Sequence, residues 1–387
     1  MVKAVAVLAV FLALLPGTSV DAAEKPIIPP PPQVAASSYL LMDADTGDVL
    51  VEQNAHEPLP PASLTKIMTS YIAAQEIDAG RARLTDQVPI SVKAWQAPGS
   101  RMFIREGTTV PLEDLLRGII IQSGNDASIA VAEHIAGSED AFAAMMNQQA
   151  EVLGMTSSHF VNATGLPTEG HQTSAWDLAQ LTVSLINRFP SHYAMYSERS
   201  FTFNEIDQPN RNRLLWRDKT VDGVKTGHTE EAGFCLVASA LRGNMRLISV
   251  VMGTDSDEAR MRESQKLLSY GFRYFETQKL YDAGVPLKTE RLYYGEADEI
   301  ELGLAAPVAV TIPRGSYDDL KAELKIPKAV EAPVAEGDAL GELILSLYDE
   351  EVVRVPLVAL TNVEEAGMFS RFADWISLFI ADLLGSE

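Results

Sequence analysis

The sequence has very few of the residues that build disulfide frameworks and metal sites. Among its 387 residues there is one cysteine, Cys235, so neither an intramolecular disulfide nor a cysteine-rich metal site can form. The six histidines show no His-Glu-x-x-His spacing, which excludes the common zinc-peptidase pattern. We therefore expect chemistry that needs no metal and no other cofactor.

Positively charged residues are also scarce. The chain has 31 lysines and arginines against 53 aspartates and glutamates, which gives a net charge of −22 at pH 7. This excess of negative charge repels a phosphate backbone, and the sequence contains no run rich in lysine and arginine. We therefore do not expect this protein to bind nucleic acid.

The apolar run at the start of the chain is too short for a comfortable membrane span. It covers residues 4–15, follows Lys3, and precedes the small residues Val20 and Ala22. A spanning helix needs about 20 apolar residues, whereas a shorter run followed by small residues is typical of a secretory signal. We predict a signal peptide over residues 1–22 and an exported protein.

The next segments predict a tether and a large mixed domain. Residues 23–34 contain the stretch PIIPPPP, which is typical of a stiff, extended linker. The domain over 35–278 opens with a hairpin pattern around Asp45–Gly47, and helical patterns dominate from Leu64 to about Leu185 before strand patterns return. Strands at both ends with helices between them predict an α+β fold whose central strands come from the two ends.

The C-terminal part has a different pattern. From about Tyr281, alternating runs such as VAVTIP and GELILSL are separated by Gly, Pro and acidic turns, which predicts a small all-β domain over 279–362. Residues 363–387 are expected to hold an amphipathic helix over 366–384. Its apolar face consists of Met368, Phe369, Phe372, Trp375, Ile376, Phe379, Ile380 and Leu383. Such a helix is expected to lie in a membrane interface.

The stretch PASLTKIMTS contains the first candidate for catalysis. Ser63 and Lys66 are three residues apart in what reads as an amphipathic helix that starts just before Ser63, so both side chains can lie on one face. Lys66 can act as a base only if its pKa falls from about 10.4 to near neutrality, which burial and a neighbouring cation can cause. The alternative is a chance pair of polar residues on a solvated face.

A second polar group, Ser123 to Asn125, follows the apolar run LLRGIIIQ. At the junction of two helices it would be sheltered from water, where polar atoms without partners are costly. One interpretation is an ordinary capping turn. In a catalytic site, the Ser123 hydroxyl would relay a proton to a leaving amine, and Asn125 would orient Lys66 and the substrate amide.

The third motif is the triplet Lys225–Gly227, which enters a strand pattern. At a sheet edge it supplies a cation, a hydrogen-bond donor and room for a substrate peptide that pairs as an additional strand. Lys225 would be the second cation that lowers the pKa of Lys66, and the His228 amide would join that of Ser63 in an oxyanion hole.

Each motif occurs once and in this order, which makes the set far more specific than any one member. With this set the chain resembles the penicillin-recognising serine acyltransferases, and more closely the secreted low-molecular-weight penicillin-binding proteins, which act as D-alanyl-D-alanine carboxypeptidases. The stretches PLPPASLTKIMTS, IIIQSGND, QPNRNRLLW and DGVKTGH carry the resemblance. It implies a penicillin-binding fold, with a helical cluster on an antiparallel sheet, over roughly residues 35–278.

The resemblance implies a role for each catalytic residue. Ser63 would be the acylated nucleophile and Lys66 its base, while Ser123 and Asn125 would be the relay and orienting groups.

The same resemblance implies the residues that bind the substrate. They would be Lys225, Thr226, Gly227, His228 and Arg211. Arg211 would help hold the terminal carboxylate of the substrate, and Thr226 would donate to it. Arg213 lies two residues further on and is an alternative to Arg211.

The implied activity is removal of the terminal D-alanine from the stem pentapeptide of peptidoglycan through an acyl-serine intermediate, which β-lactams would trap as a slower ester. The implied role is in cell-wall biogenesis and cell shape. The expected location is the periplasmic face of the cytoplasmic membrane, to which the C-terminal helix would attach the protein peripherally.

Two other functions are alternatives to the carboxypeptidase. A class A β-lactamase usually carries a Glu-x-x-x-Asn pattern between the second and third motifs, and no glutamate from Glu133 to Glu205 has an asparagine four residues on. A penicillin-binding receptor without turnover would be expected to have a spanning helix and no complete second domain. The carboxypeptidase is therefore the favoured prediction.

Overall fold

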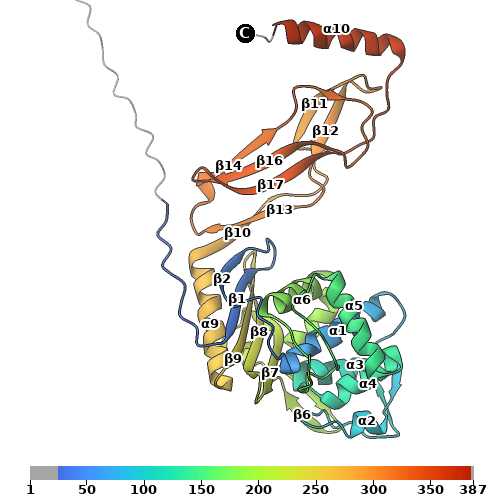
Figure 1. Ribbon diagram of the computed structural model, residues 1–387, viewed down its shortest axis with the longest axis vertical. Coiled ribbons are helices and arrows are strands. Elements are labelled where there is room, and N and C mark those ends of the chain that lie inside the picture. Colours follow the sequence, from blue (N-terminus) through green and yellow to red (C-terminus); the bar gives the residue numbers. More distant parts are fainter. Residues whose placement is uncertain (1–24, 385–387) are drawn as a thin grey trace, which may run out of the picture.

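The computed structural model describes residues 25–384 (Figure 1). The predicted signal peptide lies outside the described residues, as do the first two residues of the predicted tether. The described part of the tether runs along helix α9 (Asp257–Tyr274), where Tyr270 donates to the Pro29 carbonyl oxygen at 2.9 Å. The chain therefore reaches its first strand already packed against the domain.

A five-stranded antiparallel sheet forms the centre of the N-terminal part, in the order β2-β1-β9-β8-β7. Its strands are β1 (Ser38–Asp43), β2 (Val49–Gln53), β7 (Val221–Thr229), β8 (Gly233–Arg242) and β9 (Met245–Thr254). Strands from the start and the end of the segment pair directly, with Leu41 opposite Ser249. This confirms the predicted α+β arrangement, and β7 is left at an edge of the sheet.

Helices cover both faces of this sheet (Figure 1). Alternation along β1 sends Leu40 and Met42 into one core and Leu41 into the other, because successive side chains of a strand point to opposite faces. The second core contains residues of α9. The first lies beneath α1 (Thr65–Asp78), α3 (Leu112–Arg117), α4 (Asn125–Ala136), α5 (Glu139–Val152) and α6 (Ala175–Arg188).

Several of these helices begin at a serine that caps the first turn. The Ser138, Ser174 and Ser256 hydroxyls each accept from the amide three residues later, at the starts of α5, α6 and α9. The remaining short elements of this domain are α2 (Val92–Trp95), α7 (Pro190–Tyr193), α8 (Leu214–Arg217), β3 (Gln87–Pro89), β4 (Thr109–Pro111), β5 (Ser200–Phe203) and β6 (Ile206–Pro209).

The predicted amphipathic helix around the first motif is wrong in two respects. Ser63 lies in a single 3₁₀ turn, Ala62–Leu64, and α1 begins only at Thr65. The first ten residues of α1 are all buried, so this helix has no solvated face there. The reason is its position, since α1 contacts α4, α5, α6 and the edge strand β7. A buried central helix excludes the interpretation that Lys66 is an ordinary surface residue.

The C-terminal part is all-β, as predicted. Strand β10 (Phe275–Tyr281) pairs with β13 (Val308–Pro313), and a six-stranded sheet has the order β14-β16-β17-β12-β11-β15. Its strands are β11 (Lys288–Tyr293), β12 (Glu299–Gly303), β14 (Leu320–Lys325), β15 (Val330–Glu331), β16 (Ala339–Leu347) and β17 (Glu350–Ala359). The expected domain boundary after residue 278 falls inside β10.

The described residues end in helix α10 (Met368–Leu384), at the far end of the β domain from the catalytic motifs (Figure 1). Asp374 attaches this helix to the β domain, because its carboxylate accepts from the Tyr294 amide at 2.7 Å and from Arg291 at 3.3 Å. The apolar side chains face outward, with Phe369 93% and Trp375 53% exposed. Within residues 25–384, no helix meets the length and hydropathy that a membrane crossing requires.

Candidate active site

The first motif forms a buried hydrogen-bonded group. The Lys66 amine donates to the Ser63 hydroxyl at 2.9 Å, to the Asn125 side-chain oxygen at 2.7 Å and to the Thr164 carbonyl oxygen at 2.5 Å. Lys66 is fully buried, so these three acceptors replace its hydration. The predicted contacts of Lys66 with Ser63 and with Asn125 are both present.

Burial also changes the acidity of this lysine. The pKa of Lys66 is lowered from 10.5 to about 7, mainly by desolvation and in part by the charge of Arg211, while Asp126 acts in the opposite direction. Desolvation is therefore the main cause, and Arg211 is a cation that the motifs did not assign to this role. Desolvation lowers the pKa of Lys225 itself, and repulsion from Lys66 and Arg211 adds to the effect. Two buried amines so close together disfavour a second proton.

The second motif lies at a helix junction, as expected. Ser123 adopts a left-handed conformation, with φ of 65°, between the turn at Gly118–Gln122 and the start of α4. Its hydroxyl is buried and has no hydrogen-bond partner among the described residues. Asn125 donates to the Pro98 carbonyl oxygen at 2.6 Å while it accepts from Lys66. Because hydrogen bonds hold Asn125 on both sides, its side chain orients the Lys66 amine. An ordinary capping turn would not make these two contacts.

The third motif occupies the edge strand β7 beside the turn that carries Ser63. Lys225 and Thr226 are 2% and 4% exposed, and the Lys225 amine donates to the Thr226 carbonyl oxygen at 3.2 Å. A Cβ atom at Gly227 would lie 3.0 Å from the Pro61 carbonyl oxygen. The glycine thus lets the turn with the nucleophile approach the strand, and His228 is the first exposed residue beyond it.

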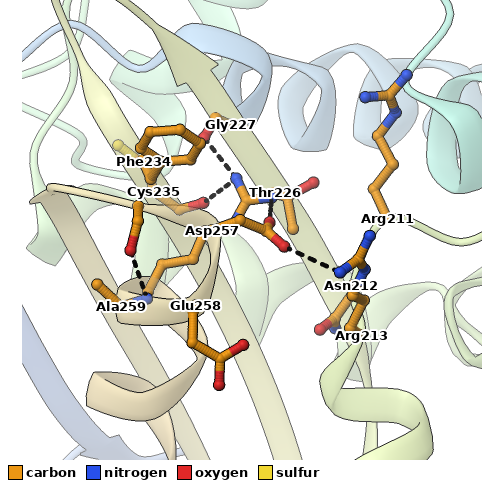
Figure 2. A network of polar contacts seen from close by, with 12 residues as sticks. Arg211, Asn212, Arg213, Thr226, Gly227, Phe234, Cys235, Asp257, Glu258 and Ala259 are labelled. Atoms are coloured by element: carbon orange, nitrogen blue, oxygen red, sulfur yellow. Dashed lines mark hydrogen bonds and ion pairs between the residues drawn. The ribbon is translucent and has the colours of Figure 1, made fainter.

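The structure distinguishes the two candidate arginines. Arg211 donates through Nε to the Gln122 carbonyl oxygen at 2.9 Å, and it is near enough to Lys66 and Lys225 to lower the pKa of both. Arg213 instead turns toward Asp257, at 3.7 Å (Figure 2). Arg211 is therefore the arginine that lies with the two lysines.

Comparison with known proteins agrees with this geometry. The family described as D-alanyl-D-alanine carboxypeptidase, peptidase S11, matches residues 24–256, and the family described as penicillin-binding protein 5, C-terminal domain, matches residues 275–365. The chain belongs to the D-alanyl-D-alanine carboxypeptidase family. The family predicted from the three motifs is thus confirmed, and so is the fold.

Individual carboxypeptidases of this family are similar over nearly the whole chain. The D-alanyl-D-alanine carboxypeptidase DacC of Escherichia coli is 44% identical over 363 residues, which cover 92% of this chain and 91% of the relative. The crystal structure of penicillin-binding protein 5 from Haemophilus influenzae has a TM-score of 0.84 and 41% identity, and it covers 87% of this chain and 99% of its own. Penicillin-binding protein 6B from E. coli gives a TM-score of 0.73 at 40% identity, with 87% and 98% covered.

Some parts of this carboxypeptidase site left no signal in the sequence. The acceptor at Thr164 is a backbone carbonyl, so its residue type carries no information. Gly165 permits the contact between Lys66 and the Thr164 carbonyl oxygen, because a Cβ atom at position 165 would lie 1.8 Å from the Ala62 carbonyl oxygen. Arg260 of α9 donates to the Gly227 carbonyl oxygen of β7 at 2.8 Å, yet in sequence it is one polar position of a helix.

Asp126 is another residue that the sequence did not single out. Its carboxylate accepts from the amides of Met102 and Phe103 at 3.0 and 2.9 Å, and it thereby holds the loop that passes over Asn125. The only hint was its place directly after the Ser-x-Asn motif. We regard Asp126 as a positioning residue, because its carboxylate makes these contacts with the loop.

Proposed function

We propose that this chain is an exported serine-type D-Ala-D-Ala carboxypeptidase that releases the terminal D-alanine from the stem pentapeptide of peptidoglycan. The observation that carries the proposal is the 2.9 Å contact between Ser63 and a buried Lys66 whose pKa is about 7. About half of such lysines are neutral at pH 7, so the group can accept the serine proton. Family membership supports the substrate class.

In the first step, neutral Lys66 accepts the proton of the Ser63 hydroxyl, and the serine oxygen attacks the carbonyl carbon of the penultimate D-alanine. The oxyanion that forms is stabilised by the amides of Ser63 and His228. The close contact between Gly227 and the turn at Pro61 supports this pairing, because it brings the two backbones together.

In the second step, the bond to the terminal D-alanine breaks and the leaving amine needs a proton. The buried Ser123 hydroxyl has no partner in the described part of the chain, so it is free to relay one from Lys66. Arg211, Thr226 and Lys225 hold the terminal carboxylate during this step.

In the last step, water attacks the ester, Lys66 accepts the proton of that water, and the Ser63 hydroxyl is regenerated. A β-lactam follows the first steps but keeps its leaving nitrogen tethered to the acyl group, which blocks the path of the water. β-Lactams are therefore inhibitors that form a slower ester with Ser63.

The location we propose is the periplasmic face of the cytoplasmic membrane, with α10 lying flat in the interface. The outward apolar face of α10 supports it, since Asp374 turns its polar side to the β domain. The β domain would act as a spacer that separates the cleft from the membrane, and the enzyme would act in cell-wall biogenesis and cell shape.

Substitution of the nucleophile tests the central proposal. Ser63→Ala should abolish both D-alanine release from a pentapeptide and covalent labelling by penicillin, because one oxygen atom carries both reactions. Mass spectrometry of intact protein measures the label, and analysis of the peptide products measures the release. Labelling that survives in Ser63→Ala and maps to another residue would overturn the assignment.

A further inference from the structure

The turn that carries the nucleophile has a strained backbone. Ala62, which directly precedes Ser63, has φ of 47°, in the left-handed region that residues other than glycine rarely adopt. Such a conformation persists only where the surrounding structure determines it. The Ala62 carbonyl oxygen is a point at which neighbouring residues contact this turn.

Thr65 supplies a side-chain donor to that oxygen. Its fully buried hydroxyl donates to the Ala62 carbonyl oxygen at 2.9 Å. The Thr65 amide divides its hydrogen between the carbonyl oxygens of Ala62 and Ser63, whereas the hydroxyl donates to Ala62 alone. Gly165 covers the same oxygen, since a Cβ atom at position 165 would lie 1.8 Å from it. This close approach leaves little room for a water molecule to replace the Thr65 hydroxyl.

His171 fixes the direction in which the Thr65 hydroxyl donates. Burial lowers the pKa of this imidazole to about 4, so the ring is neutral at pH 7. The Val161 amide donates to Nδ1 of His171 at 3.0 Å, which places the single ring proton on Nε2. Nε2 lies 2.8 Å from the Thr65 hydroxyl oxygen and donates to it. Because the hydroxyl accepts from His171, its own proton is directed to the Ala62 carbonyl oxygen.

The Ala62 carbonyl and the Ser63 amide belong to one peptide unit. A trans peptide is planar, and its C=O and N–H bonds point in opposite directions. A contact that fixes the carbonyl therefore also fixes the direction of the Ser63 N–H bond. Hydrogen bonds to the carbonyl oxygen polarise the peptide as well, which strengthens its N–H group as a donor.

We propose that His171 is a positioning residue that, through the Thr65 hydroxyl, orients the Ser63 amide toward the oxyanion. The inference rests on the proposed function, because it assigns residues that support the oxyanion hole of that reaction. His171 acts on the substrate only through Thr65 and the Ala62–Ser63 peptide. Its effect belongs to the transition state, where negative charge develops on the substrate oxygen, and not to substrate binding.

Variants of the full-length protein test both links. Thr65→Val removes the hydroxyl but keeps the shape of the side chain, Thr65→Ser keeps the hydroxyl, and His171→Leu removes the donor to it. The measurement is D-alanine release from a pentapeptide. Rates are expressed per molecule of protein that penicillin labels after prolonged incubation, so that misfolded protein is not counted.

The expected effect is on kcat. Removal of an entire oxyanion-hole donor lowers kcat by about 10²–10³, and loss of its alignment should cost less. Thr65→Val and His171→Leu should each lower kcat about tenfold at unchanged KM, whereas Thr65→Ser should stay within about twofold of the wild type. The double variant Thr65→Val/His171→Leu should be no slower than Thr65→Val, because the two side chains act in one chain.

Ser70→Ala is the matched control. Ser70 lies on the same helix, five residues after Thr65, and makes the same kind of contact, because its buried hydroxyl is 2.6 Å from Nε2 of His192. Loss of this hydroxyl should lower the unfolding temperature, as loss of the Thr65 hydroxyl does, but should leave kcat unchanged.

A transition-state analogue separates alignment from folding. The boronic acid analogue of N-acetyl-D-alanine forms a tetrahedral adduct with the Ser63 oxygen, in which a boron hydroxyl takes the position of the oxyanion. Its affinity should fall about tenfold in Thr65→Val and should not change in Ser70→Ala.

The outcomes separate the two proposals. If the wild type releases no D-alanine from the pentapeptide, the proposed carboxypeptidase function fails. If the wild type is active and Thr65→Val keeps its kcat, or if Ser70→Ala loses as much, the role of Thr65 is wrong. If Thr65→Val is slow but His171→Leu is not, or if the two effects multiply in the double variant, His171 is not the positioning residue.

Discussion

At the scale of single residues, the acidity of Lys66 decides whether this site can work. Burial removes the hydration that favours an ammonium ion, and Arg211 adds repulsion, while Asp126 limits the effect. These opposing contributions leave the pKa at about 7, close to working pH. A general base is most effective there, because it is both available and sufficiently basic.

The pH dependence of acylation follows from that value. Since Lys66 must be neutral to accept a proton, the rate of labelling by penicillin should be constant well above pH 7 and should fall about tenfold per pH unit below it. Stopped-flow measurement of labelling between pH 5.5 and 8.5 checks this. A flat profile over that range would show that Lys66 is not the base.

Lys66→Arg is the matched variant for this experiment. Arginine keeps the charge but does not lose its proton at working pH, so labelling should fall to less than about a tenth of the wild-type rate at every pH. Thermal unfolding of the variant, measured in parallel, reports whether the fold is intact.

At the scale of elements, helix α1 depends on two buried neutral histidines. His171 contacts the Thr65 hydroxyl at 2.8 Å and His192 contacts the Ser70 hydroxyl at 2.6 Å. Desolvation lowers the pKa of each imidazole from 6.5 to about 4, and for His171 the charge of Lys66 contributes. The start and the middle of the buried part of α1 are therefore sensitive to acid.

These shifts predict how stability changes with pH. Above pH 6.5 both histidines are neutral in the folded and unfolded states, whereas between pH 6.5 and 4 only the unfolded state takes up the protons. The free energy of unfolding should therefore fall as the pH drops through this range, by about 3 kcal/mol for each group.

His192→Gln isolates one of the two contributions. Urea unfolding at several pH values between 7.5 and 4 should show a loss of stability about 3 kcal/mol smaller in this variant than in the wild type. The comparison uses only the change in the free energy of unfolding with pH, so an effect of the substitution that is the same at every pH cancels. The same loss in both proteins would rule out His192 as a source of acid sensitivity.

Helix α10 is attached to the β domain through the Asp374 carboxylate, while its apolar face stays exposed. Full-length protein should float with liposomes, and moderate salt should not release it, because the helix contributes no lysine-rich face that would make binding electrostatic. A form that ends at Asn362 and the variant Trp375→Glu should float poorly. If the shortened form floats as well as the full chain, another surface binds the lipid.

At the scale of the whole molecule, the two parts have separate cores. The apolar clusters of the first part draw their residues from 28–275, and those of the β domain draw theirs from 280–363. Polar contacts join the two parts, and one of them is the 2.8 Å contact between the hydroxyls of Thr46 and Thr311. We therefore propose that the first part folds by itself.

A fragment of residues 25–274 tests this. It ends at the last residue of α9, because β10 pairs with β13 and belongs with the β domain. The fragment should be soluble, should unfold cooperatively and should be labelled by penicillin at a rate close to that of the full chain. A soluble but unreactive fragment would show that the β domain completes the active site.

The sequence by itself determined the chemistry of the site and its family. Side-chain types and their spacing are local properties, so the order of Ser63, Lys66, Ser123, Asn125 and the Lys225–Gly227 triplet could be read directly. Alternating and helical periodicity likewise predicted the mixed domain, the all-β domain and the terminal helix, because burial on one face imposes these periods.

Tertiary structure alone decided how these residues act. The pKa of Lys66 depends on burial by helices distant in sequence and on the charge of Arg211, a role that the motifs did not reveal. The Thr164 carbonyl and Arg260 reach the site through space, and α1 is buried on all sides because of what surrounds it. Desolvation and Coulomb interaction depend on distance in three dimensions, and a linear pattern does not encode that distance.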